Sequence, residues 1–254
     1  MGRKRNLVLQ ISGSLPPPTD MMDIRTFFAR LRMPRGGAAF ASGAAYERAI
    51  HARLRSCKYK NEPVRVSDPA GANKTAQDLT VLNNGLTLEA KTEKAAEGGG
   101  CTLTLQDGVL CPPAHSVLRQ YYPTDLRLWE GRIPSCLTGD RSLETWTAEK
   151  EHFKGVYIPV ASTAVAEYYR AKGTMYMQIE GKGLYHTGED ALEWGVPMFD
   201  VPCRIRIRLK QHTGGSVPQD VQACFNFKTA TLAPSPYDFM DPARLPPDFV
   251  LAAE

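Results

Sequence analysis

Apolar and polar residues alternate along residues 78–91, and this alternation predicts a β-hairpin. The dipeptide Asn84-Gly85 suits a two-residue type I′ turn, because both central positions of that turn require a positive φ. A turn at this dipeptide pairs Val81 with Leu88. The apolar side chains then share one face: Leu79, Val81, Leu86, Leu88 and Ala90. A slip of one residue would mix leucines and carboxylates on both faces, so the pattern itself selects this register.

The polar face of the predicted hairpin carries two carboxylates and an amine. In this register Thr80 lies opposite Glu89, and Asp78 lies opposite Lys91. Carboxylate oxygens beside a cationic side chain can hold a hard divalent cation. The alternative is a solvated sheet edge whose charges form salt bridges.

Helical spacing of apolar residues is clear over Gly43–Leu54, which Ser42 can cap at the N-terminus. Glu47 lies on the border of the apolar stripe of this helix. Two interpretations of Glu47 remain open: it faces inward, or it lies on the surface facing His51 one turn later.

A strand, a helix and a second strand follow further along the chain. Val156–Val160 predicts a buried strand, Ser162 or Thr163 caps a helix that Gly173 ends, and Met175–Ile179 predicts the next strand. With the first helix and the hairpin, these elements predict an α/β fold of the broad α+β kind. We expect a mixed central β-sheet flanked by helices.

Strict alternation over residues 203–210 predicts a strand with isoleucine and leucine on its inner face. The outer face forms a basic ladder: Arg204, Arg206, Arg208 and Lys210. Like charges at this spacing repel, and a phosphate backbone or nearby acidic side chains would relieve them. In the turn-rich segment Gly181–Gly188, Tyr185 and His186 are candidates for contact with bases or phosphates. Gly98–Gly100 predicts a flexible loop beside the hairpin, or a plain linker.

Asp78 followed by Glu89-Ala90-Lys91 at the end of a hairpin resembles the PD-(D/E)xK nuclease superfamily, to which most type II restriction endonucleases belong. Gln77 stands where the motif has proline. The resemblance implies a restriction-endonuclease-like core, with a helix before the hairpin that often donates a further glutamate. Glu47 fits that place.

The resemblance also implies a chemistry and a substrate. Asp78, Glu89 and the carbonyl of Ala90 would hold Mg²⁺, and Lys91 would orient the attacking water and stabilise charge on the phosphate. Glu47 would complete the metal shell or help to bind a second ion. The substrate would be double-stranded DNA, cut at a specific sequence. A homodimer is expected, because a symmetric site is most simply read by a two-fold dimer.

Length and composition change this picture little. The chain has 254 residues, 43% of them hydrophobic, and a net charge of +4, which permits nucleic-acid binding without requiring it. The six cysteines form no C-x-x-C pair, so a zinc site is not expected. We expect an arm and linker over residues 1–37, a nuclease-like domain over 38–230, and a proline-rich surface tail over 231–254.

Location and function class follow in part from missing motifs. The sequence has no secretory signal and no apolar run near the roughly 20 residues that span a membrane, so we expect an intracellular, cytoplasmic protein. It also lacks the Walker A, G-x-S-x-G and G-x-G-x-x-G motifs. We therefore interpret the chain as a metal-dependent endonuclease of restriction type. A repair, recombination or mobile-element nuclease on the same fold, and a catalytically silent nucleic-acid-binding protein, are the alternatives.

Overall fold

The computed structural model describes residues 38–69, 77–93, 96–123, 126–211 and 218–252, with the backbone alone for 38–42, 211, 218 and 219. Residues 39–254 form one compact unit, and the predicted arm over 1–37 lies outside the described residues. The helices and strands are α2 (Ala38–Arg55), β1 (Cys57–Tyr59), β2 (Glu62–Pro63), β3 (Leu79–Val81), β4 (Leu86–Lys91), β5 (Ala96–Thr102), β6 (Thr104–Gln106), β7 (Val109–Cys111), α3 (Ser135–Thr138), α4 (Leu143–Glu149), β8 (Val156–Pro159), α5 (Ala164–Ala171), β9 (Tyr176–Ile179), β10 (Gly183–His186), β11 (Cys203–Gln211), β12 (Pro218–Phe227) and β13 (Phe249–Leu251). Short 3₁₀ helices cover Val117–Tyr121, Leu128–Gly131, Thr229–Thr231 and Pro242–Arg244.

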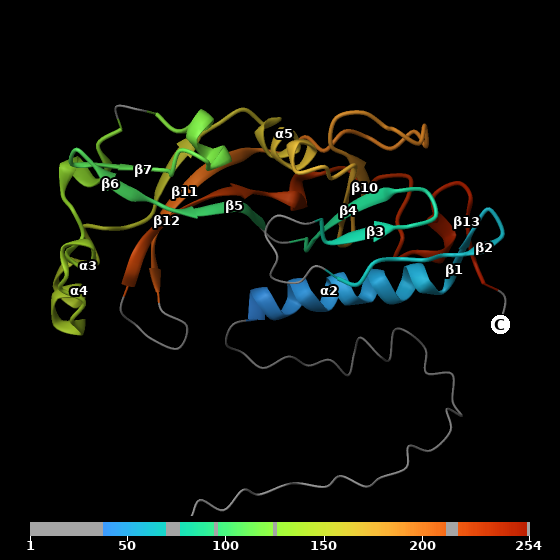
Figure 1. The fold of residues 1–254 in the computed structure, drawn as a ribbon, viewed down its shortest axis with the longest axis horizontal. Helices are drawn as coiled ribbons and strands as arrows, with labels where there is room; N and C mark the ends of the chain where they lie inside the picture. The colour runs from blue at the N-terminus through green and yellow to red at the C-terminus, as the bar shows by residue number, and fades with distance from the viewer. Residues whose placement is uncertain (1–37, 70–76, 94–95, 124–125, 212–217, 253–254) are drawn as a thin grey trace, which may run out of the picture. The chain divides into compact units, whose positions relative to one another are not determined.

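The predicted hairpin forms one half of a four-stranded sheet with the order β10-β9-β4-β3, named here the hairpin sheet (Figure 1). β3 and β4 pair antiparallel, whereas β4 and β9 pair parallel. A bridge between Val66 and Val81 places the segment after β2 beside β3. Parallel neighbours require a crossover connection, and α5 lies in the one between β4 and β9. The predicted mixed α+β class is confirmed.

Helices cover the two faces of the hairpin sheet, with α2 below it and α5 above it in Figure 1. Ile50 and Leu54 of α2 are fully buried in one core cluster with the apolar face of the hairpin. That cluster includes Leu79, Val81, Leu86 and Leu88, as the alternation predicted. The polar face of the hairpin is turned toward α5.

The observed register of the hairpin differs from the prediction by two residues. Val81 pairs with Leu86 rather than with Leu88, so the loop has four residues, and Gly85 closes it with a φ of 72°. The side chain of Asn83 explains the longer loop, because its Oδ1 accepts from the Arg65 backbone N–H at 2.7 Å. An even shift keeps every side chain on its predicted face.

A second four-stranded sheet has the order β5-β12-β11-β8 and is named here the arginine sheet. The predicted strand over 203–210 is confirmed: Ile205 and Ile207 are fully buried in the second core cluster. β8 was predicted to be a buried strand, but it lies at the edge of this sheet, where Tyr157 is 45% exposed. The helix α5 therefore connects the arginine sheet to the hairpin sheet.

The proline-rich segment over 231–254 was predicted to lie over the surface, and its aromatic residues correct that prediction. Phe239 and Phe249 are buried in the core cluster that α2 shares with the hairpin, and they contact each other with ring centroids 5.1 Å apart. β13 pairs antiparallel with β1. No helix among the described residues is long and apolar enough to cross a membrane.

Candidate active site

Glu89 is the centre of a charged cluster on the polar face of β4. Its side chain is 4% exposed, and each of its two carboxylate oxygens contacts a lysine. Oε1 lies 2.6 Å from Nζ of Lys91, and Oε2 lies 2.8 Å from Nζ of Lys172. Both ammonium groups also lie over the ring of Tyr169, at 5.4 and 5.7 Å from its centroid. The ring of Tyr169 in α5 thus lies beneath two largely covered ammonium groups.

Asp78 enters the same cluster from the residue before β3. Its Oδ2 accepts a hydrogen bond from the backbone N–H of Ala90 at 2.8 Å. The observed register, extended by one residue, places Asp78 in line with Glu89 instead of Lys91. Asp78 and Glu89 therefore lie on the same face of the hairpin, at directly opposite positions of the two chain segments.

The pKa of Asp78 is raised, first by burial and then by a neighbouring carboxylate. Burial and then the Glu89 carboxylate raise the pKa of Asp78 to about 6, although Lys91 and the Ala90 N–H lower it. Burial alone would lower the pKa of Lys91, but Tyr169, Glu89 and Asp78 outweigh it and hold that pKa above its ordinary value. The carboxylates of the cluster thus keep Lys91 charged.

Glu47 is buried, with 7% of its surface exposed, so the inward-facing interpretation holds and the surface alternative does not. It lies on α2, and its charge is the last of the causes that raise the pKa of Asp78.

The donor set fits Mg²⁺ by its chemistry. Among the described residues, no group of three or more histidine, cysteine, aspartate or glutamate side chains is arranged to hold a metal ion. Mg²⁺ is nevertheless commonly bound through one or two carboxylates and keeps several waters. Asp78 and Glu89 supply that number. The N–H and C=O of one strand residue point to the same edge, so the carbonyl of Ala90 also points toward Asp78.

Lys172 and Tyr169 were not among the predicted site residues. Lys172 is the C-cap of α5 and was hidden by its position, because a basic residue at a helix end is ordinarily explained by the helix dipole. Tyr169 belongs to the apolar stripe of that helix and has the pattern of a core residue.

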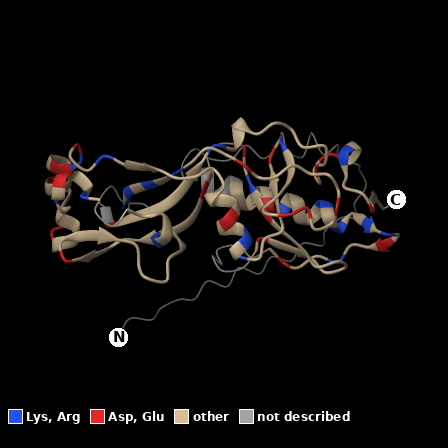
Figure 2. Cartoon of the chain, turned by 90° about the horizontal axis from the view of Figure 1, so that it is seen from above, with Lys and Arg blue, Asp and Glu red and all other residues tan. Residues whose placement is uncertain are grey.

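The basic ladder lies on the outer face of the arginine sheet, and an acidic residue partly neutralises it. Glu97 of β5 contacts Arg206 at 3.0 Å and Arg208 at 2.8 Å. Arg204 donates to Asn226 and lies over the ring of Tyr157. Relief by a nearby acid, the alternative to phosphate contact, therefore applies to two of the four cations. Figure 2 shows acidic and basic residues interspersed along the described chain.

Two other predicted contact regions are corrected. Tyr185 is 1% exposed in β10, and its hydroxyl donates to the carbonyl of Ala233, so it is not available to DNA. His186, beside it, is partly buried. Gly98–Gly100 lies within β5 rather than in a loop. A Cβ at Gly98 would collide with the hydroxyl of Tyr169, so this glycine permits close packing against the site.

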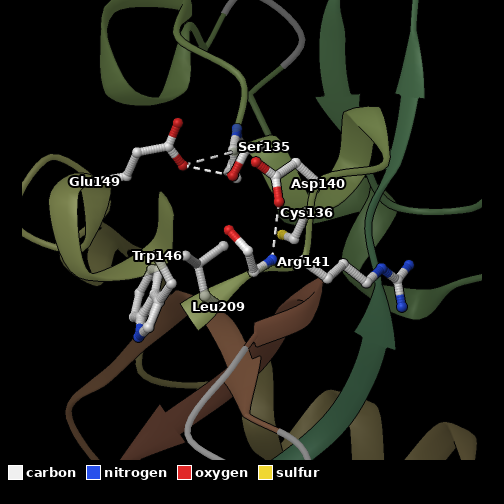
Figure 3. Close-up of a pocket in the computed structure, with 9 residues that line it drawn as sticks. Ser135, Cys136, Asp140, Arg141, Trp146, Glu149 and Leu209 are labelled. Carbon is white, nitrogen blue, oxygen red and sulfur yellow. Dashed lines mark hydrogen bonds between the residues drawn. The ribbon is translucent and has the colours of Figure 1, made fainter. Parts of the chain in front are cut away.

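A small pocket between α3, α4 and β11 shares no residue with the cluster around Glu89 (Figure 3). Its polar groups are used in local hydrogen bonds. Glu149 accepts from the hydroxyl of Ser135 at 2.7 Å, and Asp140 accepts from the backbone of Ser142 at 2.8 Å. The pocket is therefore part of the local helix packing, and the Glu89 cluster is the stronger candidate site.

Comparisons with known proteins add no relative to this description. No family model, no curated protein and no solved structure matches the chain. Function therefore has to rest on the side chains described above.

Proposed function

We propose that this protein is a Mg²⁺-dependent DNA endonuclease of the type II restriction kind, which hydrolyses phosphodiester bonds in double-stranded DNA at a specific sequence. The observation that carries the proposal is the clustering of Asp78, Glu89 and Lys91 on one face of the hairpin. These are the residues on which the resemblance to PD-(D/E)xK nucleases depends.

The order of the elements also supports the proposal. A helix that carries Glu47 precedes the hairpin, and the hairpin belongs to a mixed sheet with helices on both faces. The resemblance implies such a restriction-endonuclease-like core. Gln77 still stands where the motif has proline, and its Nε2 donates to the carbonyl of Lys172 at 2.6 Å. The side chain at this position therefore has a contact that proline would lack.

In the proposed reaction Asp78, Glu89 and the carbonyl of Ala90 would hold Mg²⁺. The bound ion supplies a Lewis acid for the phosphate and lowers the pKa of a coordinated water. Lys91 stays charged, and its ammonium group can orient that water and stabilise negative charge that develops on the phosphate. Glu47 adds negative charge beside Asp78, which favours a divalent cation at this place.

Substrate binding is proposed to use the exposed part of the basic ladder. Arg206 and Arg208 have side chains that are about one third exposed, so each can contact a phosphate while it remains near Glu97. Lys210 is exposed at the end of the same strand. A dimer on DNA, with a mass about twice 28.0 kDa, would supply one site for each strand.

The test is cleavage of plasmid DNA with Mg²⁺, followed by sequencing of the ends. Glu89→Ala and Lys91→Ala should each abolish cleavage but retain DNA binding in Ca²⁺. The exposed pair Glu151 and Lys154 offers matched controls, because Glu151→Ala and Lys154→Ala remove the same charges outside the cluster. Full cleavage by Lys91→Ala would contradict the proposal. Random nicking by a monomer, or cleavage of branched DNA alone, would favour the repair or recombination alternative.

A further inference from the structure

The end of α5 that carries Lys172 is hydrogen-bonded to the hairpin segment. Gln77, next to Asp78, donates to the carbonyl of Lys172. Thr87 of β4 donates to the carbonyl of Gly173 at 2.7 Å and accepts from the N–H of Met175 at 2.9 Å. Gly173 has a φ of 83°, and a Cβ there would lie 2.8 Å from Nε2 of Gln77. The end of α5 is therefore fixed against the strands that carry Asp78 and Glu89.

Placing the ammonium group of Lys172 at this position costs free energy of desolvation. Its side chain is 9% exposed, and Glu89 already has Lys91 as a buried partner. A buried ammonium loses its hydration, and its ion pair often does no more than compensate for that loss. Neutralising Glu89 thus does not by itself require a second lysine.

The two lysines differ in what holds them. Lys91 interacts with Asp78 as well as with Glu89, so it keeps a carboxylate partner when Glu89 is engaged elsewhere. Among the described residues, Lys172 forms an ion pair with Glu89 alone. Each carboxylate oxygen of Glu89 already contacts a lysine, so a divalent cation bound by Glu89 must lie close to an ammonium group that repels it.

We propose that Lys172 neutralises Glu89 in the metal-free protein and moves away from it when Glu89 ligates a divalent cation. The released ammonium group then binds a phosphate oxygen of the substrate. This inference rests on the proposed function and extends it with a second cation, which contacts Oε2 of Glu89 whereas Lys91 contacts Oε1. The ligand class is an anionic phosphodiester, which an ammonium group contacts by a charge-assisted hydrogen bond.

Lys172→Met tests this role, because it keeps the length of the side chain and removes the charge. Mn²⁺ affinity, measured by calorimetry without DNA, should increase by about tenfold or more, since a competing cation is lost. Single-turnover cleavage at saturating metal should fall by about 10- to 100-fold, as expected when a charged hydrogen bond is lost. Lys172→Arg should stay near the wild type in metal affinity and retain part of the cleavage. Lys154→Met should change neither quantity.

A purely structural role predicts the opposite sign for the metal, because a damaged site would bind Mn²⁺ more weakly and also cleave more slowly. Weaker or unchanged Mn²⁺ binding by Lys172→Met would therefore overturn the inference. The wild-type protein gives a second readout that needs no variant. Reductive methylation followed by mass spectrometry should label Lys172 faster with Mg²⁺ than with EDTA, and an equal rate would also overturn it.

The two proposals fail in different ways. A wild-type protein that binds Mn²⁺ and releases Lys172 but leaves DNA intact would refute the nuclease proposal, and with it the phosphate contact. It would keep the competition between Lys172 and metal. Cleavage that depends on Glu89 but is unaffected by Lys172→Met would refute the role of Lys172 alone.

Discussion

Replacing Asp78 by asparagine should stabilise the metal-free protein at alkaline pH, although it alters a residue of the candidate active site. The ionised Asp78 is buried near Glu89, and these are the first two causes that raise its pKa to about 6. Asparagine has almost the same shape, and its side-chain oxygen can still accept from the Ala90 N–H. The substitution therefore removes the charge and can keep the contact.

The size of the effect follows from the difference between folded and unfolded pKa. An aspartate has a pKa of about 3.9 in the unfolded chain, so its raised folded pKa means that the folded state prefers the protonated form. The favourable contribution of this group is complete below about pH 4 and is lost as pH rises through about 6. Relative to a side chain that does not titrate, Asp78 then costs about 1.5 kcal/mol at pH 5, where it is mostly protonated in the folded state, and about 3 kcal/mol at pH 8, where it is ionised.

Urea unfolding in EDTA at several pH values between 5 and 8 measures this cost. The free-energy gap between Asp78→Asn and the wild type should grow with pH in favour of the variant. Asp68→Asn is the control, because Asp68 is exposed and surface substitutions usually change stability by within about 0.5 kcal/mol. A gap that is constant with pH, or a variant that is less stable at pH 8, would refute the reasoning.

Three further predictions concern packing and charge outside the carboxylate pair. Gly98→Ala should destabilise the protein by about 1–3 kcal/mol in urea unfolding, because the new methyl group meets the fixed hydroxyl of Tyr169; unchanged stability would place the ring elsewhere. Phe249→Ala should cost about 3–5 kcal/mol in the same assay, since its ring packs 5.0 Å from that of Tyr59; a loss below 1 kcal/mol would fit a surface tail. Glu97→Gln should raise DNA affinity at low salt and steepen the log–log salt slope by up to about 0.9 for each arginine it frees, and a flat response in a filter-binding titration would count against DNA contact by this sheet.

The faces of the hairpin could be predicted from the sequence, whereas its loop could not. Period-two alternation is a local property, and it survives an even shift of register. The loop length instead depends on Asn83, whose side chain also donates to the carbonyl of Pro63 at 3.1 Å. That contact joins segments 20 residues apart, and residue spacing in the hairpin alone does not reveal it.

Lys172 was missed in the sequence for the same reason: its contact with the site joins segments that are far apart in the chain. Lys172 reaches Glu89 across 83 residues of sequence, and its placement depends on where the crossover helix ends against β3 and β4. Tyr185 was misassigned because the glycines around it are typical of a turn, yet Gly183–His186 continues the hairpin sheet as β10. Local spacing in the sequence indicated Asp78, Glu89 and Lys91. Their partners from the α5 segment, Lys172 and Tyr169, could be identified only from the three-dimensional structure.

The long crossover between β4 and β9 has a consequence for how the protein folds. The pairing of β9 with β4 closes a long loop of the chain, which includes β5 and β8 of the arginine sheet. Contacts of such large sequence separation form slowly, because the chain between them loses its conformational freedom before the contact repays it. The hairpin and α2 can form from nearby residues, and we expect the contact between Glu89 and Lys172 to form later, because 83 residues separate the two. Refolding from denaturant should therefore restore helix and strand signals before it restores the metal affinity proposed for this site.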